Sequence, residues 1–269
     1  MTPDLRILSL GAGVQSSTLA LLIEKGVVPM VDVAIFADTK SEPKAVYDFL
    51  NWIETQLSYP IYRVSSSNLK QDIIDAIGGE HTFLYAPFFT KNPQTGKKGI
   101  LRRHCTIDYK VTPIVQKVRQ LLGLKKGEKR KKGTKVEMLM GISTDEITRM
   151  KPNPLKYISN TYPLIDLEMS RNDCKEWMKK YNYPEPPRSA CTFCPYHSNE
   201  EWEKIKQDKK EWEEVVKLDL LLRKGTKRNV SEIFLHKECK PISEIDFNKD
   251  TKLKQLDLFT EECDGICAL

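Results

Sequence analysis

The chain has 269 residues, of which 40% are apolar and 30% are charged, and its formal net charge is +6. This length and composition suffice for one substantial hydrophobic core with a small appended lobe. No run approaches the 18 consecutive apolar residues of a membrane-spanning helix, and the first residues lack the basic segment of a secretion signal. We therefore expect a cytoplasmic protein with no membrane partner.

Strands and helices are predicted to alternate along the first half of the chain. Apolar runs predict strands at 5–10, 31–37, 61–64 and 136–140, and helical periodicity predicts helices at 15–25, 44–57, 69–77 and 110–122. Short connections between them indicate an α/β fold, a doubly wound parallel sheet. Ligands of such sheets bind at the carboxyl ends of the strands.

The remaining segments are less regular. Residues 78–99 are irregular and aromatic, which predicts an ordered loop over a site. The character of the sequence changes near residue 158, so we predict two domains, 1–158 and 159–269. In the second domain we expect a helix at 170–180 with Ser170 as its N-cap, and one long charged helix over 199–223.

The opening stretch RILSLGAGVQSS places a glycine-rich turn between a strand and a helix. Glycines let a backbone approach an anion, and the helix N-terminus offers unpaired N–H groups. The hydroxyls of Ser16 and Ser17 would add donors. A dinucleotide also fits, because Asp38 ends the second strand where a ribose-binding acid belongs, and a turn without a ligand stays open. The Walker pattern is absent.

A basic segment, KKGEKRKKGTK, spans residues 125–135 and holds seven Lys or Arg residues and one Glu. A solvated surface loop explains it, and so does contact with the phosphate backbone of tRNA or DNA.

Seven cysteines in such a chain indicate a reducing compartment, where clustered thiols bind metals or do redox chemistry more often than they form disulfides. Cys191 and Cys194 have the spacing of two metal ligands, and Cys105 is a third candidate. Cys267, Cys263, His104 and His197 are candidates for the fourth ligand. Zinc, an iron–sulfur cluster and no metal all stay open.

Five segments then fall into the order typical of one family. They are Leu8-Ser-Leu-Gly-Ala-Gly-Val-Gln-Ser-Ser17, Phe36-Ala-Asp-Thr39, Cys105-Thr-Ile-Asp-Tyr-Lys110-Val-Thr-Pro113, Gly141-Ile-Ser-Thr-Asp-Glu146-Ile-Thr-Arg149, and Tyr162-Pro-Leu-Ile-Asp166 followed by the CxxC. Over residues 5–200 the chain resembles the PP-loop family, in its phosphoadenosine phosphosulfate (PAPS) reductase branch. That branch includes adenylylsulfate reductases and nucleic-acid sulfur transferases. The resemblance implies an adenine nucleotide alpha hydrolase-like fold with a C-terminal helical, cysteine-containing extension.

The resemblance also implies roles for individual residues. Those expected to bind the nucleotide are Ser9, Gly11, Ala12, Gly13, Gln15, Ser16, Ser17, Asp38, Thr39 and Gly141. Arg149 and Lys110 are expected to act on phosphate or sulfate, although an ion pair of Arg149 with Asp145 and a solvated Lys110 are the structural alternatives. Cys105, Cys191 and Cys194, with Cys267 as the fourth ligand, are expected to hold a 4Fe-4S cluster, or zinc instead. Cys263 and Cys267 are the expected catalytic thiols.

Three positions depart from the family pattern. His104 precedes Cys105 where the cluster-bearing reductases have a second cysteine, which leaves a three-cysteine cluster with an open fourth place. Gln15 stands where ATP-cleaving members have Asp, which shifts weight towards a sulfonucleotide. The tail Glu262-Cys263-Asp-Gly265-Ile-Cys267 only partly matches the reductase Glu-Cys-Gly-x-His segment.

Three functions follow as expectations. The first is ATP-dependent adenylation and sulfur transfer to a nucleic-acid acceptor, with a cluster or a cysteine persulfide supplying sulfur. The second is reduction of PAPS or adenylylsulfate to sulfite by a C-terminal cysteine and a thiol reductant. The third is a zinc-stabilised, non-enzymatic nucleotide- or nucleic-acid-binding module. The sulfur donor, a role for Mg²⁺ and a homo-oligomer stay open.

Overall fold

The computed structural model describes residues 2–79, 84–225 and 231–248. These residues form two compact units. The first unit comprises residues 2–66 and 106–189, and the second comprises residues 67–105 and the described residues from 190 onward. The predicted cysteine-containing tail lies outside the described residues.

The first unit is built on a five-stranded parallel sheet. Its strands are β1 (Leu5–Ser9), β2 (Val33–Ala37), β3 (Ile61–Val64), β6 (Val136–Met140) and β7 (Ile158–Thr161), in the order β3-β2-β1-β6-β7. The four predicted strands and the doubly wound parallel sheet are confirmed. The domain boundary predicted at residue 158 stays a prediction, and Ile158 is the first residue of β7, an edge strand of this sheet.

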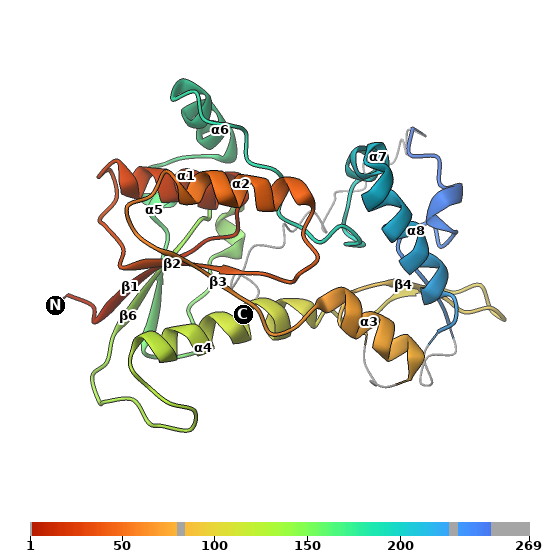
Figure 1. The fold of residues 1–269 in the computed structure, drawn as a ribbon, viewed down its shortest axis with the longest axis horizontal. Coiled ribbons are helices and arrows are strands. Elements are labelled where there is room, and N and C mark those ends of the chain that lie inside the picture. The colour runs from red at the N-terminus through yellow and green to blue at the C-terminus, as the bar shows by residue number, and fades with distance from the viewer. Residues whose placement is uncertain (1, 80–83, 226–230, 249–269) are drawn as a thin grey trace. The chain divides into compact units, whose positions relative to one another are not determined.

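Helices cover both faces of this sheet, as Figure 1 shows. One face carries α1 (Val14–Glu24), α2 (Lys44–Glu54), α5 (Pro163–Asp166) and α6 (Arg171–Lys180), and the other carries the π-helix η1 (Ile107–Val111) and α4 (Thr112–Leu121). Side chains alternate along each strand, so Leu8 and Phe36 pack on the α1 face whereas Ile7 and Ile35 pack on the α4 face.

The strand order reverses beside β1. The chain runs from β1 outward to β3 and then returns to place β6 on the other side of β1. The carboxyl ends of β1 and β6 therefore form the topological switch point, where ligands of doubly wound sheets bind. Two loops leave the sheet there, one beginning after Ser9 and the other after Met140.

The second unit contains an antiparallel sheet that the sequence does not reveal. Its strands β4 (Phe89–Lys91), β5 (Lys98–Ile100) and β8 (Glu232–Phe234) pair in the order β5-β4-β8. The prediction of an irregular loop over 78–99 is therefore wrong for β4 and β5. The unit also contains α3 (Leu69–Gly78) and the 3-10 turn η3 (Ile242–Glu244).

The single helix predicted over 199–223 is two helices, α7 (Asn199–Gln207) and α8 (Lys209–Leu222). Asp208 separates them, because its extended backbone ends α7 while its carboxylate accepts hydrogen bonds from the N–H groups of Lys210 and Glu211. No helix in the described part of the chain is long and apolar enough to cross a membrane.

Candidate nucleotide site at the switch point

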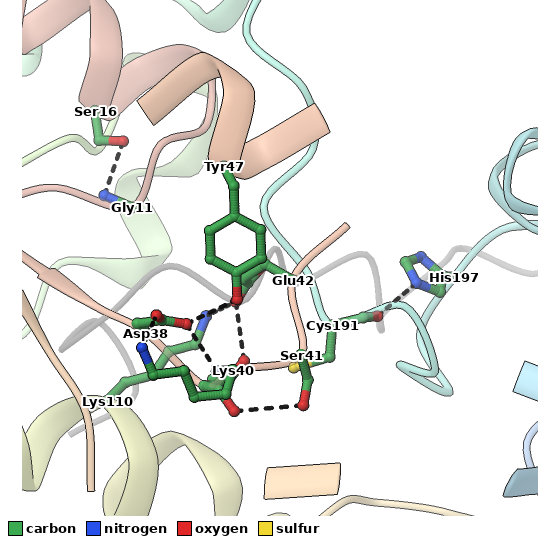
Figure 2. A network of polar contacts seen from close by, with 11 residues as sticks. Gly11, Ser16, Asp38, Lys40, Ser41, Glu42, Tyr47, Lys110, Cys191 and His197 are labelled. Atoms are coloured by element: carbon green, nitrogen blue, oxygen red, sulfur yellow. Dashed lines mark hydrogen bonds and ion pairs between the residues drawn. The ribbon is translucent and has the colours of Figure 1, made fainter. Parts of the chain in front are cut away.

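The loop from Gly11 to Ser17 turns the chain from β1 into α1. Gly13 is the N-cap of α1 and makes no side-chain capping hydrogen bond. Ser16 holds the turn closed, because its Oγ accepts from the Gly11 N–H at 3.1 Å and lies 3.4 Å from the Gly13 carbonyl oxygen (Figure 2). Ser17 Oγ is buried without a hydrogen-bond partner among the described residues. An anion at this helix N-terminus would meet backbone N–H groups and the positive end of the helix dipole.

Ala12 is strained at the start of this turn. Its φ is +59°, in the left-handed region that costs a residue with a Cβ about 1–2 kcal/mol. The side chain is completely buried, so packing holds the strained conformation in place. The left-handed backbone conformation of Ala12 sets the direction in which the loop runs from β1 into α1.

Gly141, the residue after β6, packs directly on the start of α1. A Cβ added at Gly141 would lie 2.6 Å from both the backbone N and the Cα of Ser16. The sequence predicts that this glycine lets a nucleotide approach closely. The structure shows a close approach between Gly141 and the protein's own loop, which only glycine permits, and the contact with a nucleotide stays a prediction.

Gln15 ties the loop to two other elements. Its amide Nε2 donates to Ser143 Oγ at 3.3 Å and to Glu146 Oε2 at 3.1 Å, and its Oε1 accepts from Arg171 Nη1 at 3.0 Å. Gln15 is 1% exposed. The residue that departs from the family pattern is therefore a buried bridge between α1, the 3-10 turn η2 (Thr144–Arg149) and α6.

Glu146 and Arg171, two of the partners of Gln15, each have a charged neighbour of their own. Arg149 pairs with Glu146 at 2.7 Å, so the expectation of an ion pair between Arg149 and Asp145 is wrong. Asp145 instead accepts the backbone N–H of Arg171 at 2.9 Å. Burial opposes ionisation of Asp145, but hydrogen bonds from Ser143 and Arg171 outweigh it and lower the pKa of Asp145 below its usual range.

A second polar group lies at the carboxyl end of β2, next to β1. We call Asp38, Thr39, Lys40, Glu42, Tyr47 and Lys110 the β2 cluster (Figure 2). Asp38 Oδ1 accepts from the Lys40 N–H at 2.7 Å and the Tyr47 hydroxyl at 2.9 Å, and Asp38 Oδ2 pairs with Lys40 Nζ at 2.8 Å. Burial, and then the hydrogen bond to Asp38, raise the pKa of Tyr47 well above its ordinary value, so Tyr47 stays a donor.

Lys110 is buried rather than solvated. Its Nζ lies 3.7 Å from Glu42 Oε1, with 6% of the Lys110 side chain and none of the Glu42 side chain exposed. Lys110 sits in η1, a π-helical turn, and such turns are frequent at functional sites.

Sequence reasoning missed Glu42 and Arg171. Glu42 lies in the short loop that leaves the carboxyl end of β2, where a charged residue signals a ligand site, and Arg171 follows the N-cap Ser170 directly.

The thiols of the expected metal site lie in the second unit. The Cys194 N–H donates to the Cys191 carbonyl oxygen at 2.9 Å, and the same oxygen lies 2.9 Å from His197 Nε2 (Figure 2). Across the described ranges, no three His, Cys, Asp or Glu side chains are gathered to hold a metal ion. Cys263 and Cys267 lie outside the described residues, so the cluster expected on Cys105, Cys191, Cys194 and Cys267 stays a prediction. Cys174, in α6, is fully buried in the core of the first unit.

The basic loop of residues 125–135 and the switch point lie at opposite ends of the strands. The loop joins α4 to β6 and so meets the amino end of β6, whereas the switch point is at the carboxyl end. The five residues of β6 separate these two ends by about 16 Å. Its one acid, Glu128, accepts the Lys125 N–H at 2.7 Å, while the seven basic side chains of the loop are exposed.

No protein-family model matches the sequence, and no curated protein is significantly similar to it. Among solved structures, the chain is similar to the phosphoadenylyl-sulfate (PAPS) reductase of Candida auris in its phosphate complex. The two share 16% sequence identity with a TM-score of 0.44, over 69% of this chain and 76% of that chain. The α/β fold itself follows from this chain's own sheet order.

Proposed function

We propose that this protein is an enzyme that binds an adenine nucleotide, with the nucleotide's phosphates at the N-terminus of α1. The observation that carries the proposal is the turn from Gly11 to Ser17 at the topological switch point. There the N-terminus of α1 has no side-chain cap, and the hydroxyl of Ser17 has no hydrogen-bond partner in the part of the chain that the structure describes, so both can serve an anion. The order of sequence motifs, from the turn through Asp38 to Arg149, supports adenine as the base.

As the reaction, we propose adenylation of an acceptor oxygen by ATP, followed by sulfur transfer. The acceptor oxygen attacks the α-phosphorus and pyrophosphate leaves, which turns that oxygen into part of a good leaving group. A sulfane-sulfur donor first loads Cys263 or Cys267 as a persulfide, whose outer sulfur attacks the activated carbon while AMP departs. The second cysteine thiolate then attacks the cysteine sulfur of this carbon–sulfur–sulfur link, which releases the thiolated acceptor and leaves a disulfide that a thiol reductant restores to two thiols. The exposed basic loop supports a nucleic acid as the acceptor.

A second candidate reaction is favoured by Gln15. The loop has a neutral amide, held by Arg171, where metal-assisted ATP cleavage would use a carboxylate. Guanidinium groups suit sulfate and phosphate oxygens. In this reaction the thiolate of Cys263 attacks the sulfur of a sulfonucleotide, the sulfur–oxygen bond breaks, and the nucleoside phosphate leaves. A second thiol then displaces sulfite from the thiosulfonate.

No step of either reaction is assigned to an iron–sulfur cluster or to zinc, because the described thiols do not gather into a ligand set.

The two reactions are separated by their products. Purified protein is incubated with labelled ATP, with and without tRNA or DNA, and separately with PAPS and dithiothreitol. We expect pyrophosphate that depends on the nucleic acid, and loss of that release in Gly141→Ala but not in the matched control Gly78→Ala. Sulfite from PAPS without pyrophosphate under any condition establishes the second reaction instead. Absence of binding to both nucleotides contradicts the proposed function.

A further inference from the structure

Asp38 is the residue that sequence reasoning assigns to the nucleoside, but the protein itself already engages both of its carboxylate oxygens. The donors are the backbone N–H and the ammonium of Lys40 and the hydroxyl of Tyr47, all within 2.9 Å. Asp38 therefore orders the loop after β2, as acidic residues in turns commonly do.

Glu42, four residues further on, is in the opposite situation. Its side chain is completely buried, yet its contacts are few and long. Oε1 lies 3.4 Å from Thr39 Oγ1 and 3.7 Å from Lys110 Nζ, and Oε2 has no hydrogen-bond partner among the described residues. A buried carboxylate is stable only when it is paired and well hydrogen-bonded. Buried carboxylate oxygens normally accept a hydrogen bond, so the donor to Glu42 Oε2 remains to be identified.

The position of Glu42 indicates where that donor comes from. Glu42 lies in the loop between β2 and α2, and β2 pairs with β1, whose carboxyl end opens the Gly11–Ser17 turn. The ammonium groups of Lys110 and Lys40, which pair with carboxylates of this cluster, disfavour a metal ion as the missing partner. A neutral N–H or O–H donor remains.

We propose that Glu42, rather than Asp38, is the carboxylate that binds the nucleoside. Glu42 Oε2 accepts a hydrogen bond from a neutral donor of the nucleoside, a ribose hydroxyl or the amino group of the base. Lys110 Nζ, 3.7 Å from Glu42 Oε1, supplies the opposite charge of this buried pair. This inference rests on the proposed binding of an adenine nucleotide.

The test measures equilibrium binding of four nucleotides to wild type and Glu42→Gln: ATP, 2′-deoxyATP, 3′-deoxyATP and purine riboside triphosphate, which lacks the amino group. We expect Glu42→Gln to weaken ATP binding by about tenfold to a hundredfold, as expected when a hydrogen bond to a charged group is removed. The analogue that lacks the contacted donor should bind equally weakly to both proteins. That analogue identifies the donor as a hydroxyl or as the amino group.

Two variants serve as controls. Glu54→Gln makes the same change on the surface of α2, where Glu54 pairs with Arg63, and should bind all four nucleotides as wild type does. Asp38→Asn should weaken all four by one common factor, because it loosens the loop instead of removing a hydrogen bond to one donor. If Glu42→Gln does not fold, Glu42→Gln/Lys110→Met, which removes both buried charges, replaces it.

The outcomes separate the inference from the function on which it rests. If wild type binds ATP and Glu42→Gln weakens all four nucleotides equally, or none, Glu42 is not the nucleoside ligand, while the proposed function stands. The inference is also overturned if Asp38→Asn, and not Glu42→Gln, loses discrimination among the analogues. If wild type binds none of the four nucleotides, the inference is overturned, and the proposed function is wrong as well if PAPS also fails to bind.

Discussion

Gly141 and Ser16 pack backbone against backbone, with only 2.6 Å between the position of a Gly141 Cβ and the N and Cα atoms of Ser16. This close approach joins the carboxyl end of β6 to the first turn of α1. It therefore fixes the two sides of the switch point relative to each other.

Gly141→Ala should displace the Gly11–Ser17 turn, because the atoms in its way belong to the backbone and cannot rotate aside. We expect a loss of about 1–3 kcal/mol in the free energy of unfolding and a loss of nucleotide binding. Urea unfolding and nucleotide titration measure the two effects. Gly78→Ala has open space around the new Cβ and should preserve binding. Normal ATP affinity in Gly141→Ala would show that the turn does not hold the phosphates.

Gln15→Leu removes a buried amide that bridges three elements. Ser143, Glu146 and Arg171 each lose a partner, so we expect the free energy of unfolding to fall by about 1–3 kcal/mol. The same substitution at Gln116, which is exposed on α4, should change it by less than about 0.5 kcal/mol. Equal stability of the two variants, measured by urea unfolding, would contradict the bridging role.

Lys110→Met leaves the Glu42 carboxylate buried without its counter-charge. The expected cost is about 3–5 kcal/mol in the free energy of unfolding, as for other broken buried pairs. Glu42→Gln/Lys110→Met should recover most of that loss, because no charge then remains unpaired. Thermal and urea unfolding of the two single variants and the double variant complete the cycle. Additive effects would show that the two residues are not coupled.

Neutralising the basic loop should weaken nucleic-acid binding and spare nucleotide binding. The variant replaces four exposed basic residues by Gln: Lys129, Arg130, Lys131 and Lys132. These residues lie near the amino end of β6, and the switch point is at its carboxyl end. The slope of log affinity against log salt should become shallower, by about 0.9 for each DNA phosphate that the loop no longer neutralises. Replacing Lys179 and Lys180 at the end of α6 is the matched control. An unchanged slope would remove the basic loop from the proposed acceptor site.

Asp145 should contribute a pH-dependent part of the stability. Its pKa is lowered in the folded state, so this contribution is present above its ordinary value of 3.8 and is lost as the pH falls through the folded pKa. Between pH 7 and pH 3, the free energy of unfolding of wild type should therefore fall more than that of Asp145→Asn. Parallel curves for the two proteins would show that Asp145 does not gain these bonds on folding.

The sequence alone determined the arrangement of the first unit. Apolar runs placed β1, β2, β3 and β6 and the helices between them, because buried parallel strands and amphipathic helices leave strong periodic signals. The glycine-rich turn was identified as a site because it lies between a predicted strand and a predicted helix, whereas the role of Gly141 came from the resemblance to the PP-loop family. The short strands β4, β5 and β8 left no such signal, because their pairing depends on residues far apart in the sequence.

Only the tertiary structure decided which polar side chains have their hydrogen-bond and ion-pair partners within the protein. Sequence reasoning selected Asp38 and missed Glu42, but the fold gives Asp38 three donors and leaves an oxygen of Glu42 with none among the described residues. It likewise pairs Arg149 with Glu146 and buries Lys110 against Glu42. Hydrogen bonding and burial depend on distances between segments that the sequence keeps far apart, and those distances exist only once the sheet and its helices have packed together.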